Sequence, residues 1–238
     1  MNTKVLGVLG GMGPLASAHF MLRLTLLTPG ERDADHIPAV LWSDPTIPGR
    51  PEFLEGRGPD PLPALLRGIQ GLRQAGCGAI VIPCNTAHYW YQPMLDAAGV
   101  PIFHIVDAAA EDLRAAGIKP GPIGLMSTAA TQRLHIYQDR LSSLGWDCLV
   151  PDADEMAGKI APAIAAVKAN QVGRAYEPLR QVVNGLAARG AQAVVLGCTE
   201  IPLGILAGPA DGLQAPVIDT VDSLARAAIR WAKGPPAA

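Results

Sequence analysis

Two stretches of the chain repeat each other, Gly71-Leu-Arg-Gln-Ala-Gly-Cys-Gly-Ala-Ile-Val-Ile-Pro-Cys84 and Gly185-Leu-Ala-Ala-Arg-Gly-Ala-Gln-Ala-Val-Val-Leu-Gly-Cys198. They align without gaps at a constant offset of 114 residues, with glycine, leucine, alanine, valine and cysteine at matching positions. Each stretch has the pattern of a helix end, a stop glycine and a short buried strand, and the cysteine follows that strand. The sequence therefore predicts two related halves with a cysteine at the same place in each.

The repeat extends to two further blocks in the same order. Leu6–Gly11 is echoed by Ile123–Thr128, and Pro101–Asp107 is echoed by Pro216–Asp222. All offsets between matching blocks lie between 114 and 117 residues. Short buried strands resemble one another, but an ordered triple match favours duplication, and a period this long indicates duplicated lobes rather than a solenoid.

Strand-like and helical segments alternate along both halves. The expected strands are short and apolar, and a helix follows nearly every one: strands at 4–9, 40–43, 79–83, 123–126, 147–150 and 193–196, helices at 14–27, 60–75, 86–98, 132–144, 155–169 and 176–189. This alternation indicates an α/β fold with parallel sheets flanked by helices. We expect two pseudo-symmetric lobes, residues 1–103 with 215–238 and residues 104–214, with the active site in the cleft between the lobes.

Composition argues against nucleic-acid and membrane partners. The 238 residues carry 19 basic and 21 acidic side chains, so the protein has no strong net charge to attract a nucleic acid or a membrane surface. Only 5% of the residues are aromatic, which leaves few side chains to stack on bases. No apolar run reaches the length of a bilayer span. Lys4 and the apolar run after it resemble a short secretory signal, but glycines interrupt that run and the segment is repeated inside the chain. We therefore expect a cytoplasmic protein.

The cysteines divide into two kinds. Cys77 and Cys148 are expected to be small buried hydrophobic side chains, and none of the four cysteines has paired metal-ligand spacing. Cys84 and Cys198 fall at the carboxyl ends of predicted strands, where α/β proteins bind ligands. A helix N-terminus at such a place lowers the pKa of a thiol from about 8.5 towards neutrality. We expect these two thiols to be functional, because the repeat relates them.

Three motifs carry a family resemblance: Gly10-Gly-Met12-Gly-Pro14, Pro83-Cys84-Asn-Thr-Ala-His88 and Gly197-Cys198-Thr-Glu200. They resemble the aspartate/glutamate racemase family, in the correct order and over nearly the whole chain. Thr28–Asp33 and Pro45–Arg50 look closest to its aspartate racemase branch. The resemblance implies two similar α/β lobes, a small amino-acid substrate, a homodimer, and no cofactor, neither pyridoxal phosphate nor metal.

The resemblance makes Cys84 and Cys198 the catalytic pair. An α-proton is weakly acidic, so the base must be aimed and the carbanion must be held by charge already in place. One cysteine is a thiolate and the other a thiol on opposite faces of Cα, and they exchange these roles with the handedness of the substrate. A modestly lowered thiol pKa suits this acid–base work.

The resemblance also implies a set of substrate-binding residues. The α-amino and α-carboxylate groups would be held by Met12, Asn85, Thr86 and Thr199, in a pocket lined by Thr128 and Thr131. Glu200, next to Thr199, belongs to the same expected substrate-binding set. Arg50, in a Gly/Pro-rich loop, and Lys168, on a helix, match basic positions that contact the distal carboxylate, for which arginine offers bidentate recognition.

Three further residues near these positions, Glu200, His88 and Ile164, leave more than one interpretation open. Glu200 is expected to orient the backbone or cap a helix start, more than to act as a base. His88 is expected to be a helix-packing residue more than a group that tunes Cys84. Ile164 stands where the family pattern has an aromatic hydroxyl, so the range of substrates stays open.

Several alternatives remain open at this point. Relatives with a single active cysteine decarboxylate malonates or isomerise maleate, and the presence of both Cys84 and Cys198 argues against them. A hydantoin racemase is compatible with both thiols, and so is glutamate in place of aspartate. A two-lobed amino-acid-binding protein without catalysis would favour a signal peptide and no paired thiols.

Overall fold

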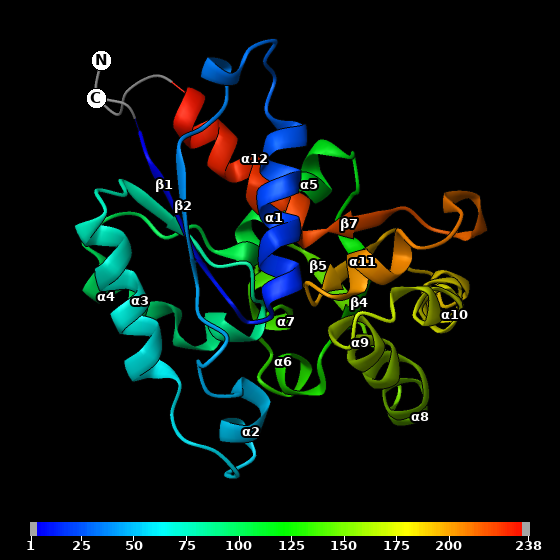
Figure 1. The fold of residues 1–238 in the computed structure, drawn as a ribbon. Coiled ribbons are helices and arrows are strands. Elements are labelled where there is room, and N and C mark those ends of the chain that lie inside the picture. Colours follow the sequence, from blue (N-terminus) through cyan, green and yellow to red (C-terminus); the bar gives the residue numbers. More distant parts are fainter. Residues whose placement is uncertain (1–3, 235–238) are drawn as a thin grey trace. The chain divides into compact units, whose positions relative to one another are not determined.

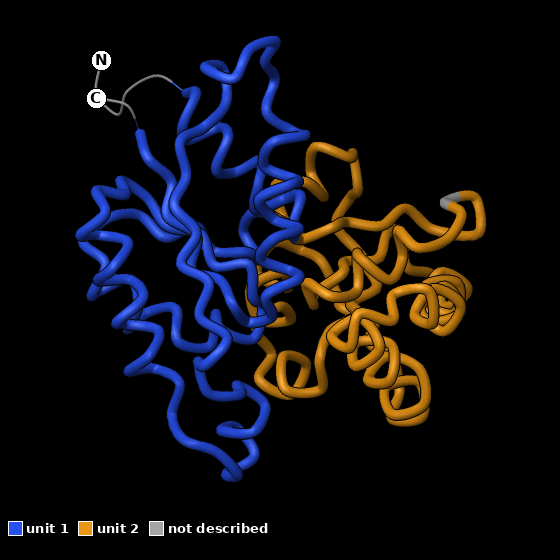
Figure 2. The backbone as a smooth tube through the Cα atoms, viewed as in Figure 1, with its two compact units in different colours: residues 1–108, 221–238 blue, residues 109–220 orange. Residues whose placement is uncertain are grey.

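The structure, a computed structural model, describes residues 4–234, except the side chain of Ala210. Within these residues the chain forms two compact units (Figure 2). Unit 1 holds the residues up to Ala108 and those from Val221 onwards, and unit 2 is Ala109–Thr220.

The chain crosses between the units inside α5 (Ile105–Ala115) and at the first residue of α12 (Thr220–Lys233). Both crossings lie a few residues beyond the expected boundaries, because each helix start is bonded to the unit it leaves. The N–H of Ile105 donates to His88 in unit 1, and the Thr220 hydroxyl donates to the Leu196 carbonyl in unit 2.

The sheet of unit 1 has the strand order β2-β1-β3 with all pairs parallel (Figure 1). Ile102 adds an isolated parallel bridge beside Ile80. The elements of this unit are β1 (Leu6–Gly10), α1 (Pro14–Leu27), η1 (Asp33–Asp35), β2 (Ala39–Ser43), α2 (Arg50–Leu54), α3 (Leu62–Gln74), β3 (Ala79–Val81), η2 (Thr86–Trp90) and α4 (Tyr91–Ala98).

The sheet of unit 2 has the order β5-β4-β6-β7, again parallel. Its strands and main helices are β4 (Gly121–Ser127), α6 (Ala129–Arg133), α7 (Gln138–Ser142), β5 (Trp146–Leu149), α8 (Ala153–Glu155), α9 (Ala161–Lys168), α10 (Tyr176–Ala188), β6 (Val194–Gly197), α11 (Ile201–Ile205) and β7 (Val217–Asp219). Short turns complete it: η3 (Met156–Ile160), η4 (Val172–Arg174) and η5 (Ala210–Gly212).

The two sheets are built in the same way. The first strand of each half, β1 or β4, is central, and the second, β2 or β5, lies on one side of it. The third, β3 or β6, after which the cysteine follows, lies on the other side. Beyond this third strand come Ile102 in unit 1 and β7 in unit 2. This is a doubly wound order, in which ligands bind beyond the carboxyl ends of the strands. The α/β fold with parallel sheets flanked by helices is confirmed.

Two helices expected to be continuous are interrupted. His135 has a left-handed φ of 53°, which ends the helix predicted at 132–144 and separates α6 from α7. The π-helical turn η3 interrupts the helix predicted at 155–169. The short helix α2 was not expected, although a proline in its first turn is the signal that marks it. The helix start expected after Cys198 is α11, which also has a proline in its first turn.

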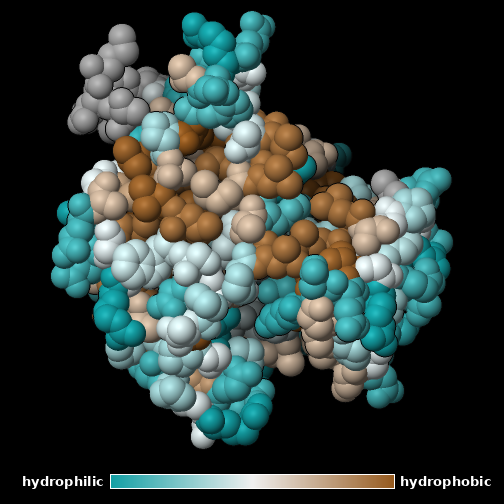
Figure 3. Space-filling model, in the orientation of Figure 1, coloured by the Kyte–Doolittle hydropathy of each residue, from teal (hydrophilic) through white to brown (hydrophobic). Residues whose placement is uncertain are grey.

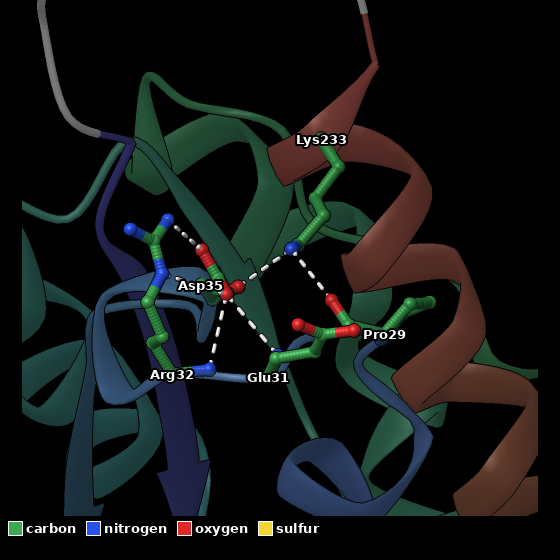
Figure 4. Close-up of polar contacts among 5 residues, drawn as sticks. All are labelled: Pro29, Glu31, Arg32, Asp35 and Lys233. Carbon is green, nitrogen blue, oxygen red and sulfur yellow. Dashed lines mark hydrogen bonds and ion pairs between the residues drawn. The ribbon is translucent and has the colours of Figure 1, made fainter.

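The C-terminal helix α12 is held to unit 1 by polar contacts at both ends. Near its start, Arg23 of α1 forms a bidentate pair with Asp222, at 2.5 and 2.7 Å. At its end, Lys233 donates to the carbonyls of Pro29 and Asp35, at 3.0 and 2.5 Å (Figure 4). These bonds explain why a helix from the end of the chain completes the first unit.

The loop after α1 is shaped by one carboxylate. Asp35 accepts hydrogen bonds from the N–H groups of Glu31 and Arg32, both at 3.1 Å, and pairs with the Arg32 guanidinium (Figure 4). This loop includes part of the segment Thr28–Asp33, which resembles the aspartate racemase branch.

In residues 4–234, no helix is long and apolar enough to cross a membrane.

The turn between β1 and α1 depends on Gly11. Its φ is +91°, and a Cβ built on it would lie 2.3 Å from the carbonyl carbon of Asp44. The backbone after β2 therefore passes against this turn at a distance that excludes any side chain. The turn leads into Met12, one of the predicted site residues.

We predict that Gly11→Ala destabilises unit 1 by about 3 kcal/mol, since both backbone strain and overlap with Asp44 act there. Gly56→Ala is the matched control, because Gly56 also has a positive φ, +73°, but nothing lies within 4 Å of its Cβ position. The control should lose only about 1 kcal/mol. Urea denaturation midpoints measure both, and equal losses would show that the contact with Asp44 costs nothing.

Candidate active site

Both predicted catalytic cysteines lie where equivalent strands end. Cys84 comes three residues after β3, and Cys198 comes directly after β6. A short helical segment follows each, η2 after Cys84 and α11 after Cys198. The thiols are buried, with 6% and 4% of their surfaces exposed.

In unit 1 the site residues come from adjacent strand ends. Met12 follows β1, which pairs with β3, and Met12 and Cys84 belong to the same buried cluster. Asn85 and Thr86 follow Cys84 at the start of η2 and are buried. The structure therefore brings four of the predicted residues of this unit to one edge of its sheet.

Arg50 belongs to the same edge, but not in the way the sequence suggested. It is the first residue of α2 rather than part of an irregular loop. Its guanidinium donates to the carbonyls of Met12 at 3.1 Å and Pro48 at 3.2 Å. Its buried Nε has no partner among the described residues. Arg50 thus fastens the Met12 loop to the segment before α2.

His88 lies one turn after Cys84, and both of its ring nitrogens are hydrogen bonded within unit 1. Its Nε2 accepts from the N–H of Ile105 at 3.2 Å, so the proton of a neutral ring resides on Nδ1. Nδ1 then donates to the Cys84 carbonyl at 3.0 Å.

In unit 2, Glu200 is the partner of the second cysteine. The Cys198 thiol donates to the Glu200 carboxylate at 3.1 Å, and the Thr199 hydroxyl lies 3.4 Å from the same oxygen. All three side chains are buried. Glu200 precedes α11, but its side chain makes no capping bond, so the expected cap is absent at this described residue.

The expected lowering of the Cys198 pKa is wrong. Burial raises the pKa of this thiol well above its ordinary value, and the negative charge of Glu200 raises it further. A hydrogen bond from the Glu200 backbone and the charge of Lys168 offset only part of this. Cys198 is therefore a protonated thiol, and the five-residue helix after it does not reverse the effect of burial.

Thr128 and Thr131 lie beside Cys198. The register of β4 with β6 pairs Ser127 with Gly197, so Thr128 and Cys198 leave the sheet as neighbours. Thr128 caps α6, since its hydroxyl accepts from the Thr131 N–H at 3.1 Å. The two hydroxyl oxygens lie 3.0 Å apart, and Thr131 is fully buried.

The two predicted positions on α9 differ from each other. Lys168 is its last residue and is exposed, while its charge still reaches the Cys198 thiol. Ile164 is buried in the apolar cluster that also contains Cys198. An apolar side chain at this position therefore contributes to packing.

The remaining cysteines are structural. Cys77 is buried, and burial raises the pKa of its thiol. Cys148 was expected to be buried but is only half-buried, because β5 is the edge strand of its sheet. Burial and the charge of Asp147 still raise the pKa of Cys148 to about 12. In residues 4–234, no group of three or more His, Cys, Asp or Glu side chains is placed to hold a metal ion.

A buried polar network at Tyr137 and Thr220 could not be recognised from the sequence motifs. Tyr137 is fully buried and hydrogen bonded to the side chain of Thr220, whose hydroxyl donates to the Leu196 carbonyl at 2.8 Å. Burial is the main reason that the pKa of Tyr137 is far above its ordinary value. Thr220 stands in the repeated block 216–222, and this was the available signal.

Comparison with known proteins identifies relatives over nearly the whole chain. Residues 9–228 match the family described as Asp/Glu/Hydantoin racemase. The broad specificity amino-acid racemase RacX of Bacillus subtilis (strain 168) is 26% identical over 234 residues, which cover 94% of this chain and 96% of RacX.

Solved structures agree with this assignment. The Picrophilus torridus aspartate racemase aligns with a TM-score of 0.84 and 34% identity, over 96% of this chain and 94% of that one. An aspartate racemase homologue from Pyrococcus horikoshii OT3 aligns with a TM-score of 0.76 over 97% and 99% of the chains. At 22% identity, the latter supports the fold alone.

We predict that Glu200→Gln lowers the pKa of Cys198, because it removes a negative charge that disfavours the thiolate. At a given pH, more Cys198 will be ionised and alkylation by iodoacetamide will be faster. Mass spectrometry of the Cys198 peptide across a pH series measures the change. Glu177→Gln removes an exposed carboxylate of the same unit and should leave the dependence of the Cys198 alkylation rate on pH unchanged. An unshifted curve in Glu200→Gln would contradict the assigned contact.

Proposed function

Because the chain belongs to the Asp/Glu/Hydantoin racemase family and is therefore an isomerase, we propose that it racemises an acidic amino acid, aspartate first. Cys84 and Cys198 act as acid and base on opposite faces of Cα. The observation that carries this proposal is that each unit presents one buried cysteine at the carboxyl end of the equivalent strand. The sequence repeat relates the two positions.

The proposed reaction is a proton exchange between two thiols through a carbanion. One cysteine, as thiolate, takes the α-proton and becomes a thiol, and the other gives its S–H proton to the opposite face and becomes a thiolate. The raised pKa of Cys198 supports it as the donor in the resting protein, which leaves the role of base to Cys84. Turnover reverses the two protonation states, so the product enantiomer enters the reverse reaction.

The groups that would hold the substrate are the buried polar residues next to the cysteines. Asn85, Thr86 and Thr199 supply amide and hydroxyl groups, and we assign the α-carboxylate and α-ammonium groups to them and to the Met12 loop. Thr128 and Thr131 would line the pocket beside Cys198. Pre-placed donors of this kind stabilise the negative charge that develops during proton abstraction.

Aspartate is favoured by two observations. The similar Picrophilus torridus enzyme is an aspartate racemase, at 34% identity over nearly the whole of both chains. Two of the predicted site residues are cationic, Arg50 and Lys168, and we assign the distal carboxylate to them, because a half-buried guanidinium suits that group.

A racemase of broader specificity is the second candidate. The guanidinium of Arg50 is already bonded to the carbonyls of Met12 and Pro48, and Lys168 is exposed. The similar Bacillus subtilis protein RacX is a broad specificity amino-acid racemase. In this reading Arg50 holds loops instead of the substrate.

We also expect the enzyme to work without pyridoxal phosphate or metal, in the cytoplasm and as a homodimer, and these remain predictions. A surface suited to self-association lies on α1, where Leu15, Leu22 and Leu26 are exposed on one face. On the face drawn in Figure 3, hydrophobic side chains gather over β2 and alongside α1. Exposed apolar patches of this kind mark interaction surfaces.

We predict that Cys84→Ala and Cys198→Ala each lower the racemisation rate by about 10²-fold or more, because each removes an acid–base group. In D₂O, each variant should still exchange the α-proton of one enantiomer through its remaining thiol. Polarimetry and proton NMR measure the two reactions. Cys148→Ala is the matched control and should keep full activity. Racemisation by either catalytic variant near the wild-type rate would remove the two-base proposal.

We predict that Arg50→Ala lowers kcat/KM for aspartate at least tenfold, since losing one partner of a buried charged pair costs about 2–5 kcal/mol. Alanine has no distal carboxylate, so its turnover should fall much less. The ratio of the two kcat/KM values separates substrate contact from damage to the Met12 loop. A parallel fall for both substrates would favour the broad-specificity reading.

A further inference from the structure

The backbone around Cys84 lies outside regular secondary structure, so no helix or strand ladder determines where its thiol points. β3 ends at Val81, and residues 82–84 belong to no helix or strand. The N–H of Cys84 donates back to the Ile82 carbonyl at 2.7 Å, within a tight local turn. The carbonyl of Cys84 accepts from the His88 ring at 3.0 Å. The direction in which the Cys84 thiol points therefore depends on His88, which holds the Cys84 carbonyl.

His88 is itself held firmly. It is 4% exposed, and its ring stacks near Tyr91 at a centroid distance of 6.2 Å. The His104 ring packs against it edge-on, with the two ring centroids 4.8 Å apart. Its second ring nitrogen accepts from the N–H of Ile105 at 3.2 Å. One rigid ring thus joins the Cys84 segment to the first residue of α5.

We propose that His88 is a positioning residue, which keeps Cys84 in line with the substrate by bridging the Cys84 carbonyl to the start of α5. This inference rests on the proposed function. A simple helix cap would explain the bond to Ile105, but it would not explain the bond to the Cys84 carbonyl.

Unit 2 has a comparable link made by a different side chain. Thr220 occupies the position of Ile105 in the repeated blocks and is the first residue of α12. Its hydroxyl donates to the Leu196 carbonyl, in the strand that ends just before Cys198. In both halves, the start of the crossing helix is therefore tied to the segment that carries the cysteine. This recurrence supports a role in placing the thiols.

Two substitutions separate the two bonds of the ring. In His88→Asn, the side-chain amide lies near the position of Nδ1, so the bond to the Cys84 carbonyl can persist while the one to Ile105 is lost. In His88→Gln, the amide reaches the position of Nε2 and keeps only the bond to Ile105. Both variants break the bridge, and near-ultraviolet circular dichroism checks that each remains folded.

The readout is α-proton exchange in D₂O carried by one thiol at a time. In a Cys198→Ala background only Cys84 exchanges the proton, and in a Cys84→Ala background only Cys198 does. We expect His88→Gln to slow the Cys84-dependent exchange by about 10- to 100-fold, as displacement of a reacting group by about 1 Å does, with little change in KM. Exchange carried by Cys198 should stay as it was. Cys84-dependent exchange at the parent rate would overturn the proposal.

The matched control is His104→Ala. His104 is similarly buried, and its Nδ1 accepts from the N–H of Val106, so this variant removes another cap from the same helix. It removes one ring that packs against His88 but leaves both hydrogen bonds of His88 in place, so Cys84-dependent exchange should fall much less than in His88→Gln. An equal loss in His104→Ala and His88→Gln would show that His88 only caps α5.

A second measurement distinguishes failure of this inference from failure of the proposed function. The rate at which iodoacetamide alkylates Cys84, relative to Cys198, is measured by mass spectrometry in protein with both cysteines. His88→Gln should change this ratio, and His104→Ala should change it much less. If no variant background shows any proton exchange, the racemase proposal fails, and the alkylation ratio alone decides whether His88 positions Cys84.

Discussion

The site depends on the parallel pairing between the central strand of each sheet and the strand that carries the cysteine. In unit 2, the ladder pairs Ser127 with Gly197, so Thr128 and Cys198 leave the sheet together. Parallel strands end at one edge of the sheet, where the first N–H groups of the following helices have no hydrogen-bond partners within the helix. Because a shift of one residue would turn every side chain to the other face, the buried apolar strands determine which groups meet there.

The sequence predicted the alternation of strands and helices and the positions of Cys84 and Cys198 after strands, because a repeated pattern of strands and stop glycines is a local property of the chain. It did not predict the order of the strands in each sheet. It did not predict that the Cys198 thiol is protonated. That result depends on complete burial and on the path of the backbone that brings Glu200 to the sulfur. The helical start at Arg50 and the exposure of Cys148 at an edge strand also depend on tertiary neighbours, which short patterns do not reveal.

The two halves share the order of their first three strands but surround their cysteines differently. The Cys84 segment is held through its carbonyl by a histidine ring, whereas the Cys198 thiol is bonded directly to a carboxylate. Duplication of a fold preserves the positions of strand ends, and the residues at those ends can then diverge. The resulting chemical difference suits a pair whose members must begin a reaction in opposite protonation states.

The return of α12 to the first unit also bears on how the protein is made. Unit 2 is a continuous stretch of chain, from Ala109 to Thr220, whereas unit 1 is split. Val221, Leu224 and Ala228 of α12 are fully buried. Part of the core of unit 1 is therefore still missing when the ribosome has synthesised only the N-terminal part of that unit. Although domains tend to fold in the order of their synthesis, here the inserted second unit is the first to become complete, and the N-terminal segment must wait for the last helix to emerge.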